Sequence, residues 1–98
     1  MSKLILRVRT KDNLLELLAQ SQTGDWKVGR DKIQEITHIQ VVNWDGTQMI
    51  EGVFDRNASY YVDESNIRFI VKFLDGKIVN CNVEFKSQNP VNYIHEYF

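Results

Sequence analysis

The chain has 98 residues, of which 43% are hydrophobic and 26% charged, and it carries a net charge of −1 at pH 7. This length suits one packed domain over residues 1–98 and excludes a two-domain enzyme. The near-neutral charge excludes a global positive field, so a polyanionic partner has to be held by a local patch. With one cysteine, no long apolar run and no signal-peptide core, we expect a cytoplasmic protein without disulfides or membrane contact.

The N-terminal third predicts a strand followed by two helices. Residues 3–9 alternate between apolar and polar side chains, which is typical of a strand with one buried side. Residues 10–21 change to helical spacing of leucines and predict the main helix. Three polar residues are candidate caps for its first turn: Thr10, Asp12 and Asn13. Residues 22–29 then predict a polar loop, and residues 30–35 a short helix.

The remainder of the chain predicts β-structure. Residues 38–44 are rich in branched side chains, and an Asp-Gly step separates them from residues 47–54, which indicates a hairpin. Residues 55–63 are mostly polar and predict a loop. Residues 89–98 suit either a capped helical turn or a final strand, and we favour a turn followed by a strand.

A second Asp-Gly step, at residues 75 and 76, predicts another hairpin between residues 66–73 and 77–85. A two-residue loop there would place asparagines beside the apolar stripe of the partner strand. A three-residue loop instead aligns apolar side chains across the two strands, so we prefer it. The pairs that it predicts are Phe69 with Cys81, Val71 with Val79, and Ile67 with Val83.

These elements together indicate an α+β fold. We expect a small, bent, mixed or antiparallel sheet of five or six strands that closes into a pseudobarrel, with one main helix and one short helix.

Catalysis has no support in the sequence. Cys81 alternates with apolar neighbours and is expected to be a small core residue, and neither His38 nor His95 forms a motif with it. Phosphate loops, nucleophile elbows and paired metal ligands are absent. We therefore expect a non-enzymatic protein that uses no metal and no cofactor.

The charge is unevenly distributed along the chain. Residues 1–32 hold seven basic and four acidic residues, so the remainder is acidic. An aromatic ring beside arginines can stack a nucleobase and hold its phosphate, and Trp26 lies in the basic part. Four basic residues are the candidates for such a small anion site: Arg7, Arg9, Lys27 and Arg30. The alternative is that these residues are solvated surface charges and that the ring is a lid on the core.

Two short motifs carry a resemblance to known domains. Residues 24–30 contain Trp-x-Val with a following basic residue, and residues 88–93 are Gln-Asn-Pro-Val-Asn-Tyr. With these motifs in this order, the chain resembles small bacterial and phage domains that we associate with the PUA-like and EVE-like pseudobarrels. It departs from their pattern at Asn92, where a basic residue is usual, and at residues 55–65, which lack the usual tryptophan.

The resemblance implies a binding module that holds RNA or a modified base in a cleft between a curved sheet and its helices. The positions that match its motifs are Trp26, Arg30, Asn89 and Tyr93. Together with Arg7 and Arg9, they make us expect a site for a nucleotide or a modified nucleic-acid base. The alternative function is a small bacterial or phage protein that binds another protein, such as a host-defence inhibitor, through residues 45–64.

Overall fold

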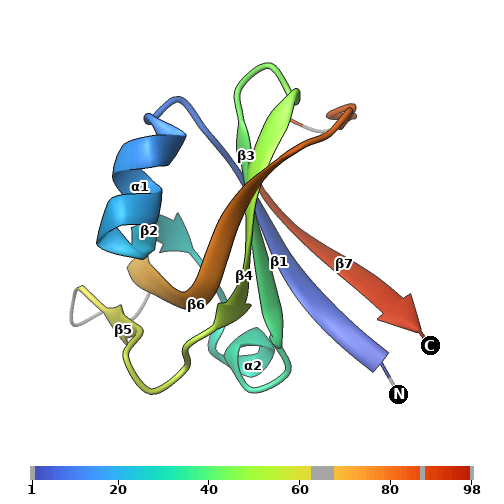
Figure 1. Cartoon of the computed structure of the whole chain (residues 1–98). Coiled ribbons are helices and arrows are strands. Elements are labelled where there is room, and N and C mark those ends of the chain that lie inside the picture. The colour runs from blue at the N-terminus through green and yellow to red at the C-terminus, as the bar shows by residue number, and fades with distance from the viewer. Residues whose placement is uncertain (1, 63–67, 87, 98) are drawn as a thin grey trace.

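The computed structural model describes residues 2–62, 68–86 and 88–97. The elements in chain order are β1 (Ser2–Thr10), α1 (Leu14–Gln20), β2 (Gln22–Lys27), α2 (Arg30–Ile33), β3 (His38–Asn43), β4 (Gln48–Phe54), β5 (Tyr60–Tyr61), β6 (Arg68–Asn80) and β7 (Val91–Tyr97). The strands curl into a half-barrel, with α1 and α2 packed at its margins (Figure 1). Among the described residues, no helix is long and apolar enough to cross a membrane.

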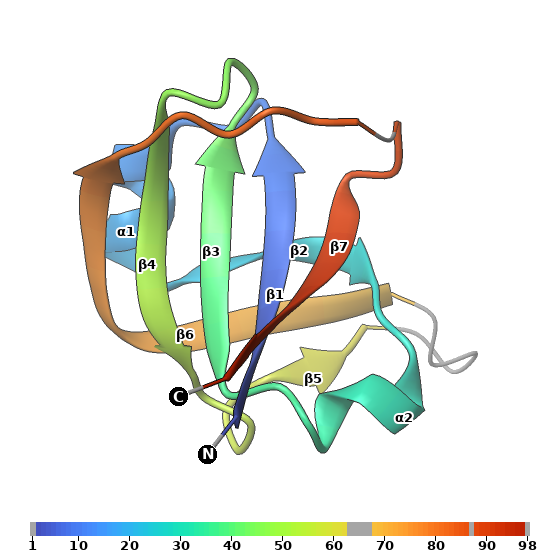
Figure 2. The ribbon, with the colours of Figure 1, turned by 90° about the vertical axis from the view of Figure 1, so that its right-hand side faces the viewer.

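All strands belong to one sheet with the order β2-β6-β4-β3-β1-β7, and β5 pairs with β6 beside this path. Strands β1 and β3 are parallel, whereas the other pairs are antiparallel. The predicted small, bent, mixed sheet is therefore confirmed, although the sheet has seven strands rather than five or six. Figure 2 shows β4, β3, β1 and β7 side by side.

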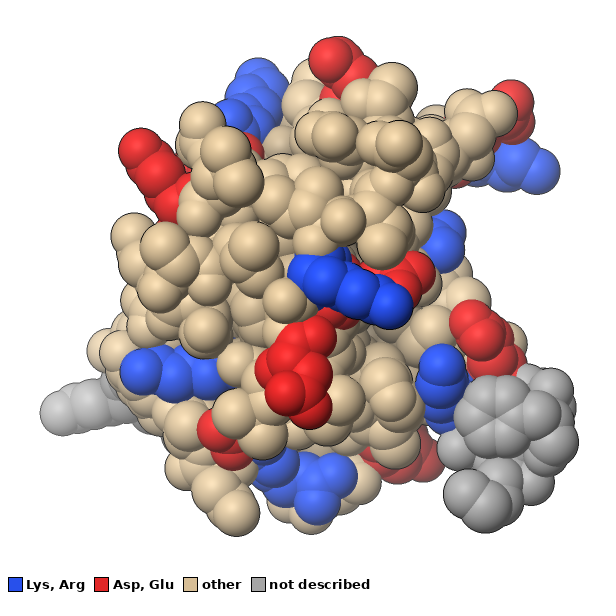
Figure 3. All heavy atoms as spheres, in the orientation of Figure 1, with Lys and Arg blue, Asp and Glu red and all other residues tan. Residues whose placement is uncertain are grey.

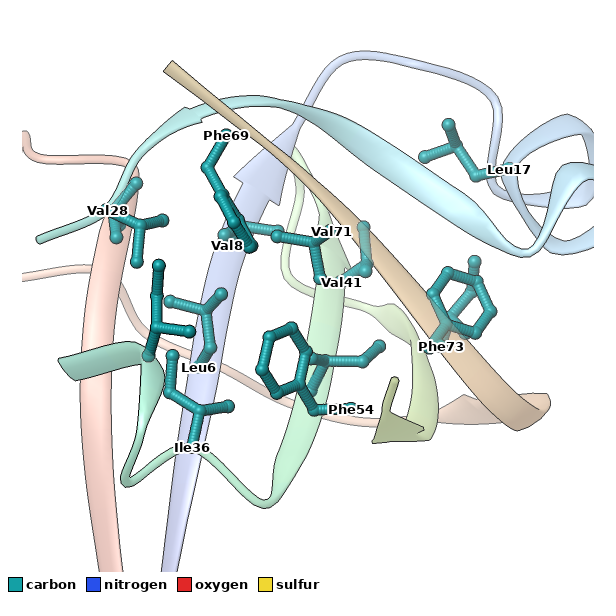
Figure 4. Packing of buried hydrophobic residues seen from close by; sticks show 14 of the residues in the cluster. Leu6, Val8, Leu17, Val28, Ile36, Val41, Phe54, Phe69, Val71 and Phe73 are labelled. Carbon is teal, nitrogen blue, oxygen red and sulfur yellow. The ribbon is translucent and has the colours of Figure 1, made fainter. Parts of the chain in front are cut away.

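The core lies inside the curled sheet. Leu4, Leu6 and Val8 on β1 are buried, as the alternation of residues 3–9 predicts. They meet apolar side chains from β3, β4 and β6 (Figure 4). The aromatic rings of Phe54 and Phe69 lie within this cluster, with their centroids 6.3 Å apart.

Both helices lie within their predicted ranges. The side chain of Asn13 accepts hydrogen bonds from the N–H groups of Leu15 and Glu16, which makes Asn13 the N-cap of α1. α1 ends at Gln20, and the C-cap residue Ser21 has a left-handed φ of 53°. α1 has seven residues and α2 has four, so neither exceeds two turns and the predicted contrast between a main and a short helix is not confirmed.

The predicted loop at residues 22–29 is wrong, because residues 22–27 form strand β2. Within the part of the chain that the structure describes, this strand pairs only with β6, and its register shifts between Thr23 and Trp26. An irregular edge strand does not need the regular alternation of apolar and polar side chains that marks a strand with one buried face. The polar composition of the segment therefore hid it.

The predicted hairpin at Asp75-Gly76 is also wrong, because β6 runs without reversal through both residues. Asp75 has a φ of 54°, and Asp75 and Gly76 lie opposite the single residue Gly52 of β4. Two residues facing one form a β-bulge, which bends a strand. Along β6, residues 68–72 pair with β2 and β5, and the strand pairs with β4 from Phe73 onward, on both sides of the bulge.

The predicted side-chain pairs fail with that hairpin. Phe69 pairs with Trp26 and Tyr61, not with Cys81. The pair of Val71 with Val79 is excluded because both residues lie on β6 itself. The third pair involves Ile67, which lies outside the described residues.

After β6 the chain crosses over the end of the sheet and returns as β7. The N–H groups of Cys81 and Val83 donate to the carbonyl oxygens of Thr47 and Gly46, each over 2.9 Å, and these bonds attach the crossing segment to the β3–β4 turn. At the start of β7, the side chain of Asn89 accepts from the N–H of Val91. The preferred turn followed by a strand is confirmed at β7.

Candidate functional site

The strand register places a transverse row of polar residues on the outer face of the sheet, and Figure 2 shows the strands of this face. Cross-strand pairing aligns five residues from five neighbouring strands: Asn92, Arg7, Gln40, Glu51 and Lys77. Within this row, Nε of Arg7 donates to Oε1 of Gln40 over 2.8 Å. This bond holds the Arg7 side chain across β1 and β3.

Residues 81–86 pass over the outer face and create a cavity beneath them. The cavity has a volume of about 220 Å³, and we call it the Phe85 pocket. Its lining comes from β1, the crossing segment and β7: Arg7, Val83, Glu84, Phe85, Lys86, Asn92, Tyr93 and Ile94. The pocket thus combines two aromatic rings, two cations, one carboxylate and an amide.

A stack of side chains fixes the position of Phe85. The guanidinium carbon of Arg9 lies 4.0 Å from the ring centroid of Trp44 and 4.2 Å from that of Phe85. Nε and Nη2 of Arg9 also donate to the carbonyl oxygen of Trp44, over 3.0 and 2.6 Å. Arg9 is therefore engaged as a support between two rings, whereas Arg7 lines the pocket itself.

A second cavity of about 230 Å³ lies on the same face, which we call the His38 cavity. Its lining includes His38 and charged residues of both signs: Lys3, Glu51, Asp75, Lys77 and Glu96. Gln40 lines this cavity and Arg7 lines the Phe85 pocket, so the hydrogen bond between them lies where the two cavities meet.

A side-chain hydrogen bond fixes the ring of His38 beside this cavity. Nδ1 of His38 lies 2.8 Å from Oγ1 of Thr37, and the same hydroxyl lies 3.3 Å from the carbonyl oxygen of Leu4. Burial and the positive charge of Lys3 lower the pKa of His38 from its ordinary value of 6.5, and Glu96 opposes this shift.

We expect this histidine to make stability depend on pH. Because its folded-state pKa is lowered, the unfolded chain binds the proton more tightly, and stability falls as the pH drops through about 6.5. Urea unfolding at several pH values should show this loss, and His38→Gln should reduce it. His95→Gln is the matched control, and an equal effect of the two substitutions would contradict the assignment.

Trp26 and Tyr93 serve partly as packing residues. Trp26 is half-buried against the core, and its Nε1 donates to Oγ1 of Thr23 over 3.1 Å. Tyr93 is half-buried too, and burial raises its pKa, although a backbone hydrogen bond from Gly29 to its hydroxyl opposes the increase. These contacts connect both rings to the structure that leads into α2.

The predicted site residues line different parts of the molecule. Arg7 and Tyr93 line the Phe85 pocket, whereas Arg30 lines a cavity beside α2. The side chain of Asn89 caps the turn before β7. Sequence reasoning missed Phe85 and Lys86, since residues 77–85 were expected to form a strand. The one sequence signal for these two site residues was an aromatic residue followed directly by a lysine.

The described parts of the chain give no structural sign of a metal or thiolate centre. They contain no group of three or more histidine, cysteine, aspartate or glutamate side chains that could hold a metal ion. Sγ of Cys81 donates to the carbonyl oxygen of Gly46 over 3.3 Å, and burial raises the pKa of this thiol. A raised pKa favours the thiol, whereas a nucleophile needs the thiolate.

Basic and acidic side chains are interspersed over the side of the molecule in Figure 3. Such mixing favours a small ligand over a long polyanion, which needs a continuous basic track. Comparisons with protein-family models, curated proteins and solved structures find no match to this chain.

Proposed function

We propose that the protein is a non-enzymatic binding module that holds a nucleotide or a modified nucleic-acid base in the Phe85 pocket. The observation that carries the proposal is the meeting of Phe85, Arg7, Lys86 and Asn92 in one cavity. An aromatic ring stacks a base, guanidinium and ammonium groups hold a phosphate, and an amide bonds to a base edge. The volume of about 220 Å³ suits one base, because sites for drug-sized ligands span about 300–1,000 Å³.

The support behind Phe85 favours this function. Because Arg9 contacts the rings of both Phe85 and Trp44, the stacking surface is ordered before a ligand arrives. Preorganisation lowers the entropy that binding costs. We also propose that the protein is related to the PUA-like and EVE-like pseudobarrels. The curled sheet with helices at its margins supports this relation.

The test is a titration with nucleoside monophosphates and with short oligonucleotides that carry modified bases. Trp44 is close to Phe85 through Arg9, so its fluorescence should change on binding. Phe85→Ala should cost about 1–3 kcal/mol of affinity, the usual contribution of one stacked base. Arg7→Gln should weaken binding and flatten its salt dependence, because fewer counterions are released.

Two variants serve as controls. Trp26→Phe should leave the fluorescence response in place, since Trp44 is the reporter. Lys27→Gln removes an exposed positive charge on β2 and should leave the affinity unchanged. Unchanged fluorescence and melting temperature with every ligand would contradict the proposal. Stoichiometric capture of a host protein in the same preparations would then favour the protein-interaction alternative.

A further inference from the structure

A third cavity lies between α2 and residues 55–61, away from the outer face that carries the Phe85 pocket. We call it the α2 cavity, and its volume is about 360 Å³. Figure 2 shows α2 and β5 behind β1 and β7, whereas residues 81–86 cross in front. The lining residues are Arg30, Ile33, Gln34, Arg56, Ser59, Tyr60, Tyr61 and Phe69.

The lining of the α2 cavity carries charge of one sign. Among the described residues that line it, two are arginines and none carries a carboxylate. The other two cavities differ, because Glu84 lines the Phe85 pocket and three acidic residues line the His38 cavity. A cavity with positive charge and no lining acid favours an anionic ligand.

Arg56 supplies a fixed positive charge at this cavity. Its guanidinium donates to the carbonyl oxygens of Ile33, Gln34 and Ile36 over 3.3, 3.0 and 3.5 Å. These bonds hold Arg56 against the end of α2. Arg56 therefore contributes its electric field, while its donors are largely engaged within the protein.

Arg30 is differently placed. Its guanidinium carbon lies 5.6 Å from the ring centroid of Tyr61, and within residues 2–62, 68–86 and 88–97 its side chain has no hydrogen-bond or carboxylate partner. A cation–π contact uses the face of the guanidinium, whereas its N–H donors point outward in the plane. The same side chain can thus cover Tyr61 and bind an anion.

The floor of the α2 cavity is apolar and fixed. The hydroxyl of Tyr61 donates to the carbonyl oxygen of Val28 over 3.1 Å, which holds its ring in place. The Tyr61 ring meets that of Phe69 edge to face, with 4.8 Å between centroids, and Ile33 is buried beside them. A flat apolar group matches this surface.

From these features we infer that the α2 cavity binds a small aromatic carboxylate. A planar carboxylate accepts two parallel N–H bonds from the edge of one guanidinium, and its ring packs on the apolar floor. This site is independent of the nucleotide site, because the two cavities have none of their described lining residues in common.

The test uses benzoate as the probe, with the backbone amide signals of the protein followed by nuclear magnetic resonance. Benzoate should shift the signals of Arg30 and Tyr61 in a saturable way. Benzamide has the same shape without the charge and should bind about tenfold more weakly, since it cannot form the charge-assisted pair. Inorganic phosphate lacks the apolar body and should show no saturation over the same range.

Substitutions locate the binding. Arg30→Gln should weaken benzoate binding about tenfold. Arg30→Lys keeps the charge without the planar donor pair, so its benzoate affinity should lie between those of the parent protein and Arg30→Gln. Lys27→Gln is the matched control, because it removes an exposed charge from the neighbouring strand and should change nothing. Circular dichroism melting shows that each variant is folded.

Three results would overturn the inference: benzamide binding as tightly as benzoate, phosphate binding as tightly as benzoate, or unchanged benzoate affinity in Arg30→Gln. Binding of nucleoside monophosphate is measured on the same samples. It should be unaffected by Arg30→Gln and by benzoate, so the failure of one site can be told from the failure of the other.

Discussion

Replacing Phe73 with alanine should lower the free energy of unfolding by about 3–5 kcal/mol, the usual cost of removing a buried aromatic ring. Phe73 is 2% exposed and lies on β6 just before the bulge. A methyl group at Gly76 would fall within 3 Å of both the Phe73 ring and the Leu18 side chain, so the ring fills the space between the bulge and α1. The cavity left by alanine could close only by moving a helix against a bent strand.

Urea unfolding measures this loss, and Leu74→Ala is the matched control. Leu74 is the next residue on β6 and is 53% exposed, so its truncation should cost well under about 1 kcal/mol. Similar costs for the two substitutions would show that Phe73 does not have the central packing position that we assign to it.

Gly46→Ala should remove nucleotide binding and destabilise the fold by about 1–3 kcal/mol. Gly46 has a φ of 76°, where a side chain is strained, and a Cβ there would collide with the carbonyl oxygen of Val83. Its own carbonyl oxygen accepts the N–H of Val83. The substitution therefore pushes away residues 81–86, which carry Phe85 and Lys86 into the pocket.

The two effects are measured by urea unfolding and by the nucleotide titration. Gly29→Ala is the control, because Gly29 has an ordinary φ of −72° and an added Cβ meets only the end of the Asp31 side chain. If folded Gly46→Ala protein bound nucleotide as tightly as the parent, the crossing segment would not form the site and the Phe85 pocket would be the wrong location.

The two Asp-Gly steps show what local sequence can and cannot predict. Asp45-Gly46 forms the predicted turn between β3 and β4, whereas Asp75-Gly76 forms a bulge inside β6. Both use the left-handed backbone that glycine and aspartate tolerate. At the second step the partner strand β4 places Gly52, whose lack of a side chain leaves room for Leu74 and Phe73, opposite the bulge. A partner strand is not visible in a short window of sequence.

The same reasoning applies to the candidate site. Arg7 could be predicted, because the alternation of residues 3–9 places it opposite the buried face of β1. The positions of Phe85 and Lys86 could not be predicted, because they follow from backbone hydrogen bonds between the crossing segment and the β3–β4 turn. The expected meeting of Arg7 with Arg30 assumed that residues 22–29 were a loop. Residues 22–27 instead form β2, which pairs with β6 and lies at the opposite end of the strand order from β7.

The pairing of β1 has a consequence for how quickly the chain can fold. Leu6 is paired with Ile39 on one side and with Tyr93 on the other, so both neighbours of β1 come from distant parts of the chain. Contacts of this kind stabilise the fold only after long loops have closed, and loop closure costs chain entropy. We therefore expect a folding time of about milliseconds to seconds. Until β7 arrives, β1 presents an unpaired edge to other chains, and association at that edge competes with completion of the sheet.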